Sequence, residues 1–136
     1  MAGLGISPAD NAVPALSPDG KMVAYSWGGI NRENFDIYVR AIGSGEALRL
    51  TTDPALDTIP VWAPDSQSIA FSRLFETQAT RRAIHSTSVV RVPVLGGPEK
   101  VLGQGLVQDW SPDGKWLYYA QYDPAQSNLM LVENLR

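Results

Sequence analysis

The sequence predicts an all-β fold made of three repeated four-stranded units. One turn-forming tetrapeptide recurs at residues 17, 63 and 111. Short apolar runs rich in Val, Ile, Tyr, Phe and Trp stand at matching positions around each copy, which is the composition that strands favour. Turn residues recur at such short intervals that almost no room is left for a helix. An internal repeat of this kind decides the architecture.

The tetrapeptide is Ser17-Pro18-Asp19-Gly20 in the first copy, Ala63-Pro64-Asp65-Ser66 in the second and Ser111-Pro112-Asp113-Gly114 in the third. Serine at the first position, proline at the second and glycine at the fourth suit a type I turn that closes a tight hairpin. Ser66 stands where the other copies have glycine. In the left-handed conformation that glycine tolerates, Ser66 would carry roughly 1 kcal/mol of strain.

Four apolar runs accompany each of the first two turns, and three accompany the third. The first run precedes the turn and the second follows it, and the third and fourth come later in the repeat. Four short strands in a repeat of roughly 45 residues are the content and period of one β-propeller blade. Residues 22–25 are apolar on both faces of their strand, which favours a sheet packed between two neighbours. The runs are residues 11–16, 57–62 and 105–110; 21–26, 67–72 and 115–120; 37–39, 89–92 and 129–132; and 47–51 and 99–102.

The blade boundaries predict a permuted chain of 136 residues in a single propeller segment. Residues 1–7 form a strap strand, residues 8–52 blade one, residues 53–103 blade two, and residues 104–136 a blade three that lacks its own fourth strand. Propellers have about four to eight blades, so three blades do not close a ring. An unfinished sheet edge and open blade faces expose unpaired backbone and apolar surface.

We therefore expect ring formation by oligomerisation, with a homodimer closing head to tail into a six-bladed ring. In this arrangement the strap strand completes the last blade of the partner. A trimer, an irregular oligomer, or a fragment of a longer natural propeller are the alternatives.

One stretch of blade two resembles the repeat of TolB-type propellers, which also occurs in tricorn-protease and dipeptidyl-peptidase-type propellers. It is Pro60-Val61-Trp62-Ala63-Pro64-Asp65, with Ile69-Ala70-Phe71-Ser72 behind it. Residues 92–97 resemble the stretch that joins the third and fourth strands in that family. Ser66 and Gln108-Asp109 depart from the pattern, which affects local geometry only.

The resemblance implies a non-catalytic scaffold for protein–protein association, as in periplasmic partners of envelope proteins. Alternatives are a fragment of a larger propeller that gates or positions substrate for a peptidase, and a sensor module of a bacterial kinase or transcription regulator.

The composition of the chain limits the classes of partner that we expect it to bind. The net charge of −3 gives no general attraction to nucleic acid or to an anionic membrane surface. No run approaches the roughly 20 apolar residues of a membrane helix, so we expect no membrane insertion. The N-terminus lacks the basic start and long apolar run of a signal peptide. The expectation is a soluble, cytoplasmic protein as written, or a periplasmic one if the chain was excised from a longer TolB-like protein.

The sequence predicts no catalytic residue, cofactor or metal site. The sole histidine, His85, lies in a long loop with Ser86 beside it, and nothing resembles a nucleophile elbow. The chain has no cysteine and no calcium-loop spacing, so few metal-ligand sets remain.

Two sets of residues are candidates for binding. Asn11 and Asp57 occupy equivalent places at the tunnel end of the first strands, where they line the tunnel or cap the turn entering the strand; Gly105 breaks this series. The second set is a loop face whose aromatic and arginine side chains are the types that interface hot spots favour. Solvated loop is the alternative for each of its members. They are Trp27, Arg32, Phe35, Arg73, Phe75, Arg81, Arg82, His85 and Tyr122.

The remaining strand aromatics are predicted to pack between blades, because their spacing follows the repeat. They are Trp62, Trp110, Trp116, Phe71, Tyr25 and Tyr119.

Overall fold

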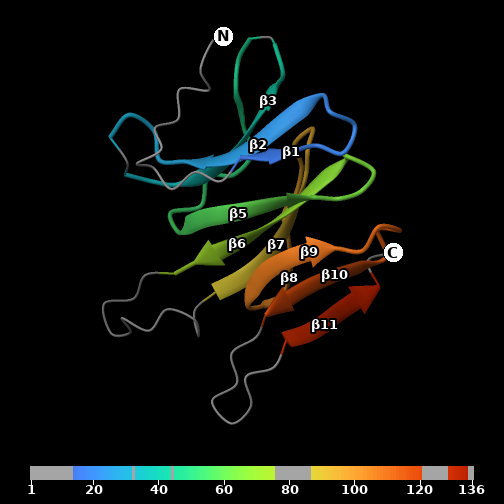
Figure 1. Cartoon of the computed structure of the whole chain (residues 1–136). Coiled ribbons are helices and arrows are strands. Elements are labelled where there is room, and N and C mark those ends of the chain that lie inside the picture. The colour runs from blue at the N-terminus through green and yellow to red at the C-terminus, as the bar shows by residue number, and fades with distance from the viewer. Residues whose placement is uncertain (1–13, 32, 44, 76–86, 121–128, 135–136) are drawn as a thin grey trace.

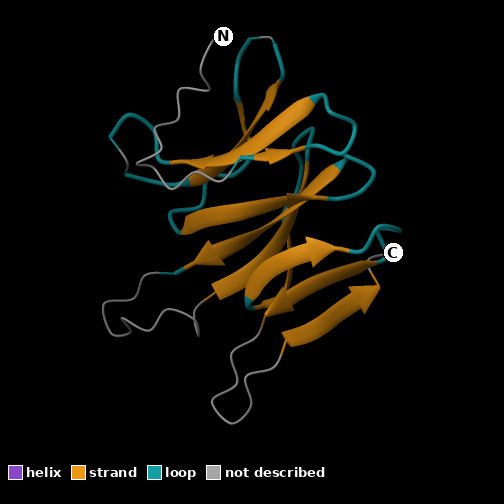
Figure 2. Ribbon diagram, viewed as in Figure 1, coloured by secondary structure: helices purple, strands orange, loops and turns teal. Residues whose placement is uncertain are grey.

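The structure is a computed structural model that describes residues 14–31, 33–43, 45–75, 87–120 and 129–134. All regular structure in this part of the chain is strand, arranged in three antiparallel sheets (Figure 2). The sheets stack in chain order, with the green and yellow sheet between the blue-cyan and orange-red ones (Figure 1). The predicted all-β fold with four-stranded antiparallel blades is therefore confirmed.

Blade one contains β1 (Ala15–Leu16), β2 (Met22–Trp27), β3 (Asp36–Ala41) and β4 (Leu48–Arg49). Each strand pairs with the next along the chain, so the sheet order is β1-β2-β3-β4. This meander is the connectivity expected of a propeller blade, in which short turns join neighbouring antiparallel strands.

Blade two has the same connectivity in β5 (Leu56–Trp62), β6 (Ser68–Leu74), β7 (Thr87–Pro93) and β8 (Lys100–Gln104).

Blade three contains β9 (Leu106–Trp110), β10 (Trp116–Ala120) and β11 (Leu129–Asn134), paired in the order β11-β10-β9. The predicted strap strand, residues 1–7, lies outside the described residues, so its pairing stays a prediction.

The three tetrapeptides form the predicted turns between the first two strands of each blade. Gly20 and Gly114 both have φ of 74°, and Ser66 has φ of 61°. The expected left-handed conformation of Ser66 is therefore confirmed. Ser17 and Ser111 add hydroxyl hydrogen bonds to the aspartate two residues on, each 2.6 Å long, which Ala63 cannot make.

A bulge interrupts the first strand of blade two. Thr58 pairs with Ser72 and Val61 with Ala70, so Ile59 and Pro60 together lie opposite Phe71. Ile59 adopts φ of 55°, which is rare for a β-branched residue. The bulge shifts the register of β5 against β6 by one residue, and this shift decides which side chains meet at the far end of the hairpin.

The hydrophobic core lies in two layers between the sheets, which we call the first joint (blades one and two) and the second joint (blades two and three). Side chains alternate along each strand, so blade two sends one set of residues to blade one and the other set to blade three. The first joint is formed by Ala24, Ile37, Val39, Trp62, Ile69, Phe71, Val90, Val92 and Val94. The second is formed by Ala63, Ala70, Val89, Val107, Trp110, Leu117 and Tyr119.

Candidate functional site: the joints and the loop face

An ionic cluster is buried where the first joint reaches the loop face. Arg73, at the end of β6, donates from Nε to Asp57 Oδ1 at 2.7 Å and from Nη2 to Asp57 Oδ2 at 3.0 Å. The guanidinium also donates to both carboxylate oxygens of Glu99, at 2.8 and 3.0 Å. The side chain of Arg73 is 6% exposed and that of Asp57 is fully buried. A guanidinium with two bidentate carboxylate partners is geometrically fixed.

Burial and pairing act in opposite directions on these charges. Burial raises the pKa of Asp57, and the hydrogen bonds from Arg73 act against that shift. Burial also acts to lower the pKa of Arg73, but the hydrogen bonds to Asp57 and Glu99 outweigh it and raise the pKa. The bidentate hydrogen bonds hold the two groups together as an ion pair, and either partner alone would be an uncompensated buried charge.

A second buried carboxylate lies at the same end of blade one. Asp36 accepts hydrogen bonds from Arg49, whose Nε lies 3.0 Å from Asp36 Oδ2, and from the Thr51 hydroxyl at 3.4 Å. Burial raises the pKa of Asp36, and the contacts with Arg49 oppose the shift. The Thr51 hydroxyl in turn accepts from the Ile37 amide at 2.9 Å. These contacts fasten β4 to β3 and close the outer edge of the blade.

Arg73, one of the residues predicted for the loop face, is buried at 5% exposure. Counting outward from the turn without a bulge would place Leu74 opposite Asp57. The bulge at Ile59 and Pro60 moves Arg73 there instead. A prolyl residue inside a strand was the sequence signal for that register change, because proline in a strand is typical of edges and bulges.

The other predicted loop-face residues are only partly described. Trp27 is half-buried and packs edge-on against Tyr38, with ring centroids 5.3 Å apart. Phe35 is also half-buried, and its carbonyl oxygen accepts from the Asp57 amide at 2.9 Å. Phe75 is 41% exposed. The remaining members, Arg32, Arg81, Arg82, His85 and Tyr122, lie outside the described residues.

Two positions of the predicted tunnel-lining series, Asp57 and Gly105, are described in the structure. Both carboxylate oxygens of Asp57 bind Arg73, so they are committed within the chain. At Gly105, with φ of 138°, a Cβ atom would come within 2.3 Å of the Ala120 carbonyl oxygen. Close backbone approach therefore explains why glycine breaks the series. Asn11 lies outside the described residues.

Each joint has the same indole hydrogen bond. Trp62 Nε1 donates to the Ala15 carbonyl oxygen at 2.7 Å, and Trp110 Nε1 donates to the Val61 carbonyl oxygen at 3.3 Å. In each case a tryptophan at the end of a first strand reaches the first strand of the preceding blade. These contacts add a directional polar bond to the packing role predicted for both tryptophans.

A serine on the second strand makes another contact across each joint. The Ser26 hydroxyl donates to the Asp57 carbonyl oxygen at 2.5 Å, and the Ser72 hydroxyl accepts from the Val107 amide at 2.9 Å. Every residue in these cross-joint hydrogen bonds lies in a strand. The bonds therefore fix the spacing between neighbouring blades and the direction in which one blade follows another.

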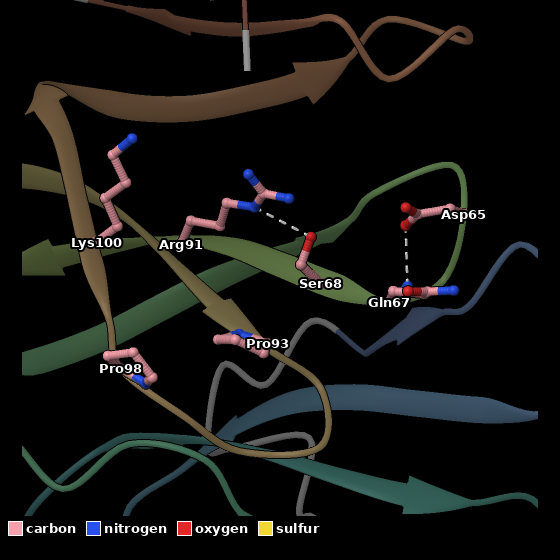
Figure 3. A pocket seen from close by; sticks show the side chains of 7 residues that line it. All are labelled: Asp65, Gln67, Ser68, Arg91, Pro93, Pro98 and Lys100. Carbon is pink, nitrogen blue, oxygen red and sulfur yellow. Dashed lines mark hydrogen bonds between the residues drawn. The ribbon is translucent and has the colours of Figure 1, made fainter. Parts of the chain in front are cut away.

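A shallow pocket of about 340 Å³ lies on blade two (Figure 3). Arg91 and Lys100 point to the same side of the sheet there. Arg91 Nε donates to Ser68 Oγ at 3.2 Å, and its guanidinium lies 5.7 Å from the centre of the Trp110 ring. Arg91 is thus part of the second joint, and the lining is Asp65, Gln67, Ser68, Arg91, Pro93, Pro98 and Lys100.

Neither a metal cluster nor a membrane-spanning helix is present in the described ranges. Within residues 14–31, 33–43, 45–75, 87–120 and 129–134, no group of three or more His, Cys, Asp or Glu is placed to hold a metal ion. In the same ranges no helix has the length and apolar character needed to cross a membrane.

Comparison with known proteins agrees with this architecture. An uncharacterised protein of Agrobacterium fabrum (strain C58) is 34% identical over 113 residues, which are 79% of this chain and 34% of that protein. TolB from Acinetobacter baumannii superposes with a TM-score of 0.71 at 18% identity, covering 98% of this chain and 31% of that one. The TolB-type protein of Agrobacterium tumefaciens gives 0.67 at 23% identity, covering 88% and 41%. Prolyl and dipeptidyl peptidase structures are matched as well. No protein-family model matches the chain.

The stacked antiparallel blades and these likenesses make the chain a β-propeller segment. More narrowly, its blades have the fold of TolB-like propellers, so the predicted resemblance is confirmed at the level of the fold. The chain spans about a third of the length of the curated relative and 31% to 41% of the two TolB structures.

Proposed function

We propose that this chain is a non-catalytic β-propeller module that works by association, and that two copies close head to tail into a six-bladed ring. The observation that carries the proposal is the repeated joint. Trp62 and Trp110 make the same contact with the blade before them, so one set of contacts adds blades in one direction. A repeated directional contact generates a ring when its rotation returns on itself.

The end blades supply the surfaces for this association. Blade one and blade three lie at opposite ends of the stack, with blade two between them (Figure 1). Leu16 at one end is 62% exposed and Trp116 at the other is 38% exposed. One exposed apolar side chain at each end supports a partner of the same kind as blade two, while Val23 and Tyr25 on the Leu16 face are 8% and 3% exposed.

Size-exclusion chromatography with light scattering tests the assembly. We expect a mass of twice the 14.8 kDa chain, with dissociation on dilution. A monomer at all concentrations would overturn self-association. A higher mass would overturn the six-bladed ring but leave self-association standing. Exposed Leu95, in the β7–β8 turn and away from both ends, provides a control variant in Leu95→Ala, which should keep the mass of the wild type.

The absence of catalysis is proposed from the roles of the serines. Ser17, Ser26, Ser72 and Ser111 all make hydrogen bonds to turn or strand partners within the chain. A serine-reactive fluorophosphonate probe should therefore label the folded protein no more than the heat-denatured one. Labelling of the folded protein alone would favour the peptidase class instead.

A further inference from the structure

We infer that the two end faces are matched to each other by an exchange of large and small side chains, so that Tyr118 of one copy packs against the partner's Leu16. The inference rests on the proposed head-to-tail association and names its register. It follows from comparing the residues that occupy equivalent positions in the two joints and at the two ends.

Inside the chain, each joint contains a tryptophan and an alanine in the same core layer. Trp62 belongs to the same core layer as Ala24, and Trp110 belongs to the same layer as Ala70. The alanine lies on the second strand of the earlier blade, and the tryptophan ends the first strand of the later one. The small side chain leaves room for the indole, as close packing requires.

Strand register identifies the equivalent positions at the ends. Leu16 pairs with Val23 as Trp62 pairs with Ile69, so Leu16 occupies the tryptophan position of blade one. Tyr118 pairs with Asp109 as Ala70 pairs with Val61, so Tyr118 occupies the alanine position of blade three.

At the ends the large and small residues have therefore changed places. A blade that brings a tryptophan to Tyr118 would be overpacked, because the phenol ring fills the space that alanine leaves at the internal joints. A blade that brings Leu16 fits, and the tyrosine supplies the bulk that the leucine lacks. The end faces thus favour each other over any internal face, which is how an interface rejects the wrong register.

The polar bonds of the internal joints are missing at these ends. Leu16 has no indole to donate to the carbonyl oxygen of Asp109 in the partner copy. Ala120 follows two residues after Tyr118, at the position of Ser26 and Ser72, and has no hydroxyl. The closing joint therefore lacks both cross-blade bonds and opens before the internal ones.

The test is a pair of single variants, Leu16→Trp and Tyr118→Ala, together with their combination. Leu16→Trp places two large side chains together, and Tyr118→Ala leaves a cavity. A closed ring contains the joint twice, so each single variant should weaken the dimer by about a hundredfold at roughly tenfold per joint. The double variant recreates the internal pair, with its indole bond, and should associate at least as tightly as the wild type.

Mixing the two single variants gives a sharper result. A mixed ring has one joint of the wild-type kind and one that pairs the introduced tryptophan with the introduced alanine, and both fit. Heterodimers should therefore form at concentrations where each variant alone is monomeric. Native mass spectrometry resolves the masses, and far-ultraviolet circular dichroism confirms that both variants remain folded.

The outcomes separate the two proposals. If the wild type is monomeric, the proposed ring fails. If the wild type is a dimer but the effects of the two substitutions simply add, or the mixture forms no heterodimer, association stands and the Leu16–Tyr118 register is wrong.

Discussion

The first and second joints bury similar apolar layers but differ in how they treat charge. In the first joint Arg73 lies 6% exposed between Asp57 and Glu99. In the second joint Arg91 is half-buried, and its described contacts are the Ser68 hydroxyl and the face of Trp110. A buried ion pair is costly to break, whereas a half-buried cation on an aromatic ring contributes little more than its packing. The first joint is therefore the one that a single substitution damages most.

The largest expected effect is a direct comparison of the two arginines. Arg73→Ala leaves the fully buried Asp57 carboxylate without its partner and should cost about 3 to 5 kcal/mol. Arg91→Ala should cost only about 0.5 to 1 kcal/mol. Urea denaturation at one fixed protein concentration measures both. Equal losses would show that the ion pair does not distinguish the joints.

For the two serines that bond across the joints, the larger loss of stability is expected in the second joint. Ser72→Ala leaves the amide of Val107, a residue that is 2% exposed, without its acceptor and should cost about 1 to 3 kcal/mol. Ser26→Ala removes a donor from the Asp57 carbonyl oxygen and should cost about 0.5 to 1.5 kcal/mol. An unpaired carbonyl is tolerated better than an unpaired amide. The same denaturation experiment decides the order, and a larger loss for Ser26→Ala would reverse our reasoning.

A smaller effect concerns the turn at the rim of the first joint. Ser66→Gly relieves roughly 1 kcal/mol of left-handed strain but removes the exposed 3.2 Å bond from the Asp19 amide. Because an exposed bond of this length is weak, the melting temperature should rise by about 2 to 4 °C. The reverse change in blade one, Gly20→Ser, should lower it. Scanning calorimetry of both variants checks the signs, and an unchanged Ser66→Gly would mean that the cross-blade bond offsets the strain.

The smallest expected effect is a dependence on pH in the turns. Hydrogen bonds from Ser17 and from the Lys21 amide lower the pKa of Asp19 below 3.8, and Ser111 and Lys115 do the same for Asp113. A lowered folded-state pKa gives stability that is present above pH 3.8 and lost as the pH falls through the folded-state value.

Asp19→Asn combined with Asp113→Asn should therefore destabilise the protein at pH 5, and the difference from the wild type should shrink at pH 3. Asp65→Asn is the control, because Ala63 provides no hydroxyl to that carboxylate, and its effect should be smaller. Denaturation curves at both pH values test this, and parallel profiles would contradict it.

The sequence predicts the blades well because their determinants are local. The recurring turn identifies each hairpin, and alternating apolar residues identify the faces that pack between sheets. The ionic cluster could not be predicted in the same way. Asp57 meets Arg73 only because the bulge at Ile59 and Pro60 shifts the register, and Glu99 reaches the same guanidinium from the segment before β8. Such contacts depend on tertiary geometry that a repeat pattern does not contain.

The placement of the tryptophans has a practical consequence for following assembly and unfolding. Trp62 and Trp110 are 7% and 6% exposed, and each lies in a different joint. A buried indole changes its fluorescence when water reaches it. With Trp27 and Trp116 replaced by phenylalanine, a chain that keeps only one of the two buried tryptophans would emit from a single known joint. Blades that separate one after another would then give two distinct transitions, so the molecule contains its own optical probes of the order in which it comes apart.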